Sequence, residues 1–229
     1  MEDGQTTRWG GSVVAAALSS LLCAIPIASA QLAVPPADPR PDAKYVFYLH
    51  GASVEENPEK AQENWRANAR ALGDKGFIVI AEQRSPNTNV RDYAKKISDL
   101  TRALVAKGVP PSNVTVVGFS KGGMITLSVA NWNQEPRMNY VILAGCAGER
   151  RAELQKEQRT AAARLKGRML SIYDAADPEF GTCQLLFDAA GGGVKGTERR
   201  VESGRGHQAF ASVDRSWLDP VVGFIESAK

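Results

Sequence analysis

The chain has 229 residues, of which 43% are hydrophobic and 23% are charged. These fractions exclude a disordered chain, a collagen-like repeat and a disulfide-dense miniprotein, and the length predicts one domain with a sizeable core. The formal net charge of +3, with both signs interspersed, does not favour a nucleic-acid partner. Two histidines and three cysteines leave little material for a metal site, so we expect none.

Residues 1–30 have the pattern of a secretory signal peptide. Arg8 supplies a positive flank, Ser12 to Ile27 is an apolar run, and Ala28-Ser29-Ala30 matches a small-x-small cleavage site. The apolar run is shorter than the roughly 18 to 20 residues that a membrane-spanning helix needs. We therefore expect an exported protein, periplasmic or secreted, with no stable membrane span after the signal is cleaved.

Two features of the predicted mature chain follow from export. Residues 31–43 contain four prolines and are expected to form an extended tether without structure of its own. Cys146 and Cys183 are the cysteines that remain after cleavage, and an even pair in an oxidising compartment predicts one disulfide. Two buried free thiols are the alternative.

Residues 44–229 alternate predicted strands with predicted helices. Continuous apolar runs, which suit strands buried on both faces of a sheet, occupy 45–49, 77–81, 114–119, 140–144 and 169–173, and a more polar edge strand is expected at 198–202. Helices are expected to begin at Asn57-Pro58, at Asn89 and at Asp219-Pro220. Residues 149–166 are highly charged and predict one solvated helix. Alternation of this kind indicates a parallel sheet with helices on both faces. In such sheets, the ligand-binding or catalytic site lies at the carboxyl ends of the strands.

The third predicted strand ends in Gly118-Phe119-Ser120-Lys121-Gly122, which matches G-x-S-x-G between a strand and a helix. In this motif the serine lies on a strained turn, and the residues two before and two after it must be small for the backbones to approach. The pattern predicts an exposed nucleophilic serine at position 120. A serine hydroxyl is a weak nucleophile, so it needs a base and an acid that orients the base.

The scarcity of histidine narrows the choice of base. In this arrangement the chain order is serine, acid, histidine, and only His207 follows Ser120. The acid is expected on the loop after the fifth strand, where Asp174 and Asp177 both occur. We favour Asp177, because it is further from the strand and the loop can reach the histidine. Gly191, Gly193 and Gly196 spell G-x-G-x-x-G but precede a strand, so we predict a loop and no dinucleotide cofactor.

These residues resemble the α/β-hydrolase superfamily, in particular its small, lidless, exported esterase-like members. The resemblance extends from Lys44 to Lys229 and rests on Tyr48-Leu49-His50-Gly51, the motif at 118–122, the acid loop at 174–177 and Gly206-His207. It implies a three-layer α/β/α sandwich with about six mostly parallel strands and no cap domain. In this family, the loop that carries the acid commonly has the sequence Gly-x-x-Asp. Asp174 here replaces the glycine, so it is expected to support the site without being the acid.

The resemblance also implies a mechanism. His207 would take the proton of Ser120, Asp177 would orient the imidazole, and backbone N–H groups of Lys121 and Ala52 would form an oxyanion hole, with Gly51 or Ser53 as alternatives to Ala52. His50 is expected to orient that loop. The Lys121 side chain is expected to be solvated, with binding of an anionic substrate group as the alternative. The predicted function is a serine hydrolase acting on small, polymeric or lipid esters. A serine peptidase, a thioesterase or a non-catalytic binding module with this fold are the alternatives.

Overall fold

The computed structural model describes residues 1–2 and 31–228. Apart from its first two residues, the predicted signal peptide lies outside this part of the chain. Within the described residues, no helix is both long and apolar enough to cross a membrane.

The described residues form one six-stranded sheet in the order β2-β1-β3-β4-β5-β6, and every strand is parallel to its neighbours. This confirms the predicted parallel architecture. The chain moves outward from β1 in one direction to β2 and in the other direction to β3, so the order reverses between β1 and β3. The strands are β1 (Tyr45–Leu49), β2 (Ile78–Ile80), β3 (Val114–Phe119), β4 (Asn139–Leu143), β5 (Gly167–Asp174) and β6 (Val194–Val201).

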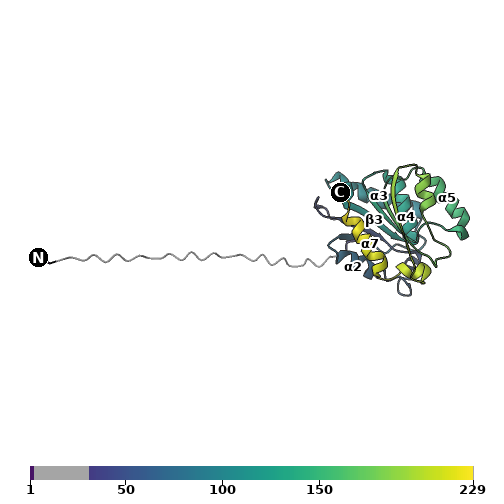
Figure 1. Cartoon of the computed structure of the whole chain (residues 1–229), viewed down its shortest axis with the longest axis horizontal. Coiled ribbons are helices and arrows are strands. Elements are labelled where there is room, and N and C mark those ends of the chain that lie inside the picture. Colours follow the sequence, from purple (N-terminus) through teal and green to yellow (C-terminus); the bar gives the residue numbers. More distant parts are fainter. Residues whose placement is uncertain (3–30, 229) are drawn as a thin grey trace.

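Helices cover both faces of the sheet and make three layers (Figure 1). Because successive side chains of a strand point to opposite faces, Tyr45 and Phe47 belong to one core cluster and Val46 to the other. The first cluster packs under α3 (Val90–Ala106), α4 (Lys121–Asn133), α5 (Ala152–Ala162) and α6 (Gln184–Ala189), and the second under α2 (Trp65–Gly73) and α7 (Arg215–Glu226). The remaining short helices are α1 (Ala52–Glu56), η1 (Pro111–Asn113), η2 (Glu149–Arg151) and η3 (Gly206–Phe210). Only η2 and α5 lie between β4 and β5, so no cap domain is inserted there.

The predicted start of the helix at Asn89 is confirmed, and two other predicted starts are wrong. The Asn89 side chain accepts hydrogen bonds from the first turn of α3. The helix expected from Asn57 begins instead at Trp65, where Asn64 accepts a hydrogen bond from Ala67 N, because the chain first forms α1 and a turn. The last helix begins at Arg215 rather than Asp219-Pro220. Its first turn is helical because Trp217 and Leu218 are buried against the sheet, and Pro220 lies inside the helix.

Strand β6 is longer than predicted and begins four residues earlier, at Val194. Its residues pair with β5 along its whole length although their side chains are mostly polar, because the pairing uses backbone groups and one face of an edge strand is solvated. Gly196, expected in a loop, is therefore a strand residue. A Cβ atom there would lie 2.6 Å from the ring of Phe187, so the close packing of α6 on β6 requires glycine.

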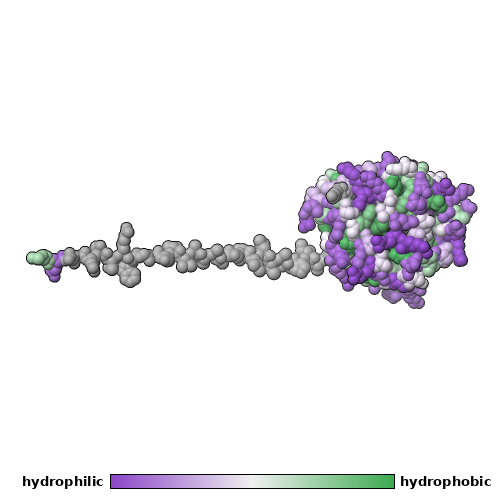
Figure 2. All heavy atoms as spheres, viewed as in Figure 1, coloured by the Kyte–Doolittle hydropathy of each residue, from purple (hydrophilic) through white to green (hydrophobic). Residues whose placement is uncertain are grey.

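Residues 31–43 differ from the expected unstructured tether at Leu32, which forms a parallel bridge with Ile80. Its N–H donates to Val79 O at 2.9 Å, and its carbonyl accepts from Ala81 N at 2.8 Å. The segment thereby adds one bridge to the exposed edge of β2. The face of the domain in Figure 2 is mostly hydrophilic, with hydrophobic residues scattered across it.

Candidate active site

Ser120 lies on the sharp turn between β3 and α4. Its backbone has φ 55° and ψ −119°, a conformation that side-chain-bearing residues rarely adopt. A Cβ atom added to Gly118 would lie 2.1 Å from Gly122 O, and one added to Gly122 would lie 2.0 Å from Leu49 O. Gly118 therefore lies directly against the backbone of Gly122, and Gly122 lies directly against the end of β1, which is the physical reason for glycine at these two positions.

Ser120, His207 and Asp177 form a continuous chain of hydrogen bonds. His207 Nε2 is 2.8 Å from Ser120 Oγ, and His207 Nδ1 is 2.7 Å from Asp177 Oδ2. Since a carboxylate only accepts, Nδ1 carries the proton and donates to Asp177, and Nε2 is left to accept from the hydroxyl of Ser120. The structure brings together the three side chains that the sequence selected, from the ends of three different strands. This is the geometry in which a histidine can remove the serine proton.

The environment keeps Asp177 ionised and His207 in place. Burial raises the pKa of Asp177, but hydrogen bonds from His207 and from the N–H groups of Glu179 and Phe180 outweigh this and hold the pKa below its usual value. The His207 ring is stacked on the Phe180 ring at 4.8 Å between centroids and packs against Phe119 at 5.0 Å. An ionised acid and a ring held on both sides restrict the imidazole to one orientation.

Asp174 binds the loops around the site through hydrogen bonds from their backbone and from Ser203. It accepts hydrogen bonds from Ala176 N at 2.8 Å and from Ser203 N at 2.9 Å, and the Ser203 hydroxyl also donates to it. Burial raises its pKa, but these hydrogen bonds together lower it below the usual value. Asp174 therefore connects the loop after β5, which carries Asp177, to the loop after β6, which carries His207.

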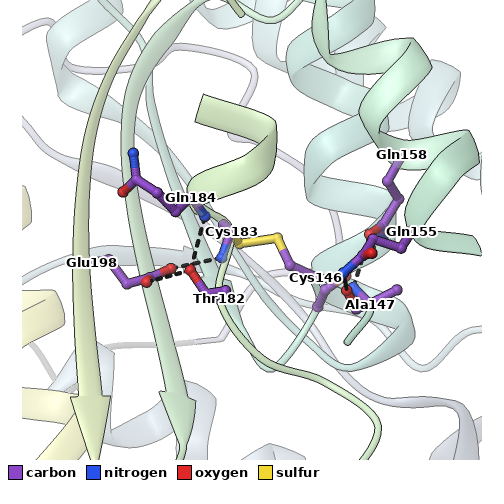
Figure 3. Close-up of a disulfide and its surroundings, with 9 residues drawn as sticks. Cys146, Ala147, Gln155, Gln158, Thr182, Cys183, Gln184 and Glu198 are labelled. Atoms are coloured by element: carbon purple, nitrogen blue, oxygen red, sulfur yellow. Dashed lines mark hydrogen bonds between the residues drawn. A yellow bond between two sulfur atoms is a disulfide. The ribbon is translucent and has the colours of Figure 1, made fainter. Parts of the chain in front are cut away.

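A disulfide joins Cys146, after β4, to Cys183, at the end of the loop that carries Asp177 (Figure 3). The pairing predicted from the sequence is present. Backbone contacts tie the same two loops together: Gly148 N donates to Glu179 O at 2.7 Å, and Gly181 N donates to Cys146 O at 3.0 Å. The disulfide and these hydrogen bonds hold the segment that follows Asp177.

Side chains on both sides of the disulfide support it (Figure 3). Glu198 of β6 accepts hydrogen bonds from Cys183 N and from Thr182 Oγ1, both at 2.6 Å. On the other side, Gln155 and Gln158 of α5 bind the backbone of residues 145–147. The highly charged helix α5 thus contributes two uncharged side chains to the loop beside the site.

Ala52 and Lys121 each begin a helix, so their N–H groups have no acceptor within that helix. Both residues line a cleft of about 510 Å³ together with Ser120 and His207, and Val90, Met124 and Phe180 supply apolar walls. The cleft lies where the strand order reverses between β1 and β3, which is the usual ligand position in open parallel sheets. Two backbone donors at helix starts that line the same cleft as a serine can stabilise a negative oxygen.

His50 is fully buried directly after β1, and its ring nitrogens bind the backbone of Gly51 and Arg84. Arg84 N donates to His50 Nε2 at 2.9 Å, so the proton of the neutral ring is on Nδ1, which donates to Gly51 O at 2.7 Å. Burial and the nearby Arg84 guanidinium lower the pKa of His50 to about 3, which keeps the ring neutral. His50 therefore holds the loop before Ala52.

Sequence reasoning missed the buried charges that surround this loop. Glu55 binds both Arg84 and Lys121, and Glu63 accepts from Gly51 N at 2.6 Å. The expectation that the Lys121 side chain is solvated is wrong, because the ammonium is paired with a buried carboxylate and only 20% of the side chain is exposed. These residues come from separate loops and helices without a shared motif, so no local pattern marks them as partners.

Comparison with known proteins supports the architecture. A family model described as phospholipase/carboxylesterase matches residues 78–173, which is less than half of the chain. Arabidopsis thaliana SOBER1 is a similar solved structure, with 15% sequence identity, a TM-score of 0.51 and coverage of 80% of this chain and 98% of that chain. An S-formylglutathione hydrolase from Agrobacterium tumefaciens has 18% identity, a TM-score of 0.56 and coverage of 86% and 88%. A truncated carbohydrate esterase from gut microbiota has 16% identity, a TM-score of 0.58 and coverage of 84% and 88%.

The six-stranded parallel sheet, its helical layers and the similar solved structures agree on the fold. The chain has an α/β-hydrolase-like fold. No protein of curated function matches it in sequence. At identities below one fifth, these solved structures show the fold alone, and the chemistry depends on the residues of the site.

Proposed function

We propose that this α/β-hydrolase cleaves carboxylic esters through an acyl-enzyme on Ser120. The observation that carries the proposal is the hydrogen-bonded chain from Asp177 through His207 to Ser120. His207 accepts the hydroxyl proton as Ser120 Oγ attacks the acyl carbon, and the resulting imidazolium is stabilised by Asp177. His207 then donates that proton to the departing alcohol. A water molecule, deprotonated by His207, hydrolyses the acyl-enzyme in the second half of the reaction.

The oxygen of the attacked carbonyl becomes negative in the tetrahedral intermediate. We assign its stabilisation to the N–H groups of Ala52 and Lys121, the first residues of two helices, which both line the cleft. Placing preorganised donors where charge develops lowers the barrier more than it strengthens substrate binding. His50 supports this arrangement by holding Gly51 O.

The expected substrate is an ester of a small molecule, a polymer or a lipid, because the cleft has apolar walls and no cap domain covers it. The disulfide between Cys146 and Cys183 supports the proposal that the enzyme acts after export, in an oxidising compartment. The fold also occurs in an S-formylglutathione hydrolase and in a dipeptidyl peptidase, so thioesters and peptides are included as competing substrates in the test.

The test combines active-site labelling with turnover. A fluorophosphonate probe is expected to add one adduct to the folded protein by intact mass, and no adduct is expected on Ser120→Ala or on unfolded protein. Turnover is then measured with matched oxoester, thioester and peptide substrates on wild type and on His207→Ala. Absence of an adduct on wild type, or normal turnover by His207→Ala, would refute the mechanism. Labelling with turnover of the peptide alone would assign the site to a peptidase.

A further inference from the structure

Three charged side chains that the proposed mechanism does not use meet beside the Ala52 loop. Glu55 Oε1 accepts from Arg84 Nε at 2.6 Å, and Glu55 Oε2 accepts from Lys121 Nζ at 2.6 Å. The side chain of Arg84 is completely buried and that of Glu55 is 2% exposed. We call Glu55, Arg84 and Lys121 the buried cluster.

A buried ion pair is a weak source of stability. Removing two charges from water costs several kcal/mol per ion, and apolar residues of similar volume often stabilise a fold as well or better. The buried cluster is therefore not explained by packing alone. Its members contact the carbonyl that precedes Ala52 and include Lys121, so they adjoin both proposed oxyanion donors. This suggests that the buried cluster positions these donors.

The buried cluster determines the direction of the Ala52 N–H through the peptide unit that precedes it. Arg84 Nη2 donates to the carbonyl oxygens of His50 and Gly51, the latter at 3.3 Å, and His50 Nδ1 also donates to Gly51 O. A peptide unit is planar and trans, so the N–H of Ala52 points away from the carbonyl of Gly51. Holding that oxygen on one side therefore turns the Ala52 N–H to the other side, and Ala52 lines the cleft of Ser120.

The same carboxylate reaches the second donor. Lys121 follows Ser120 directly, and its ammonium binds Glu55 Oε2 while its own N–H begins α4. Glu55 belongs to α1, the helix that Ala52 begins. One buried carboxylate thus connects the residue that carries the second donor to the arginine that orients the first.

We infer that Glu55 and Arg84 are positioning residues that hold the N–H groups of Ala52 and Lys121 in the relative orientation needed by the oxyanion. The inference rests on the proposed function and adds to it two residues that touch neither substrate nor Ser120. It makes transition-state stabilisation, rather than substrate binding, depend on the buried cluster.

The test is Arg84→Lys, which keeps the positive charge beside Glu55 but loses the planar fork that reaches the backbone carbonyls as well. Incorrectly oriented N–H donors weaken the stabilisation of the transition state but not the binding of the substrate. The kcat for an oxoester is therefore expected to fall about tenfold or more, while KM changes by less than about twofold. Arg70→Lys, on the exposed face of α2, is the matched control and should keep wild-type values. Turnover is expressed per folded molecule, measured by circular dichroism.

The rate ratio between an oxoester and its thionoester distinguishes positioning from a purely structural role. Sulfur accepts N–H hydrogen bonds poorly, so a thionoester gains less from the oxyanion donors, and the ratio is expected to fall in Arg84→Lys in parallel with kcat. A variant damaged only in stability would lose both rates equally. Lys121→Met, whose side chain is partly exposed and whose backbone N–H is retained, should shift the ratio in the same direction and is measured if Arg84→Lys does not fold.

This inference is overturned if the folded variant keeps both the rate ratio and kcat per folded molecule while wild type turns over the oxoester normally. The proposed function would then still stand. Absence of oxoester turnover and of fluorophosphonate labelling in wild type would refute the proposed function, and this inference with it.

Discussion

Removing the disulfide tests how much the loop that carries Asp177 depends on covalent restraint. The change is Cys146→Ala combined with Cys183→Ala, since both cysteines are fully buried and alanine introduces no polar atom. The bridge closes a loop with a sequence separation of 37, for which the chain-entropy relation gives about 4 kcal/mol at 25 °C. A loss of this size is a large part of the roughly 5–15 kcal/mol by which domains are usually stable.

The measurement is the free energy of unfolding from urea denaturation of wild type and of the double variant. The denaturant dependence should be steeper in the double variant, because its unfolded chain lacks the cross-link and exposes more surface. Wild type with its disulfide reduced is the control and should reproduce the loss without any change of sequence. A loss below about 1 kcal/mol, in both the variant and the reduced protein, would refute the loop-closure reasoning.

The activity of the double variant is expected to fall less than its stability. Gly148 N still donates to Glu179 O, and Gly181 N to the carbonyl of residue 146, so the folded loop keeps its backbone contacts. Asp177 also keeps the two N–H groups that it accepts from. We expect kcat per folded molecule at low temperature to stay within about threefold of wild type, which single-turnover acylation can measure.

Three further outcomes follow from the same structure. Asp177→Asn should lower kcat by about 10⁴-fold, because it favours the wrong tautomer of the histidine. Asp174→Asn should lower the free energy of unfolding by about 1–3 kcal/mol and largely keep kcat. The reverse result would exchange the roles of the two aspartates. Burial raises the pKa of Glu63 to about 7, above its value of about 4.3 in the unfolded chain, so the folded state binds the proton more tightly and stability falls as pH rises from about 4.3 to 7. The free energy of unfolding of Glu63→Gln, measured by denaturation across this pH range, should fall less than that of wild type. Identical pH profiles would contradict this role of Glu63. Gly122→Ala should fail to fold or lose several kcal/mol by thermal unfolding, because its Cβ would lie 2.0 Å from Leu49 O, and wild-type stability would show that the backbones can separate.

Local patterns in the sequence were sufficient to predict the strand–helix alternation, Ser120 and His207, and they limited the acid to Asp174 or Asp177, with Asp177 favoured. Buried strands are continuous apolar runs whatever their partners, and Gly118 reflects a steric demand within five residues, because a Cβ atom there would meet Gly122 O. The base could be chosen because the chain has two histidines and only one follows the serine. These features depend on residues close together in the chain, or on their order.

Other features depended on segments that are distant in sequence. The start of α7 at Arg215 depends on the burial of Trp217 against the sheet, and the full length of β6 depends on backbone pairing with β5. Asp174 and Asp177 are three residues apart, and only the position of the loop after β6 assigns one to Ser203 and the other to His207.

The sequence by itself thus determined the layered parallel sheet, the serine turn and the order of the three candidate site residues, because each of these has a local or compositional cause. Only the tertiary structure decided that the buried carboxylate of Glu55 pairs with Arg84 and Lys121. A charged residue in a loop has the same local pattern whether it is solvated or buried, and the difference arises only when a distant segment supplies the opposite charge.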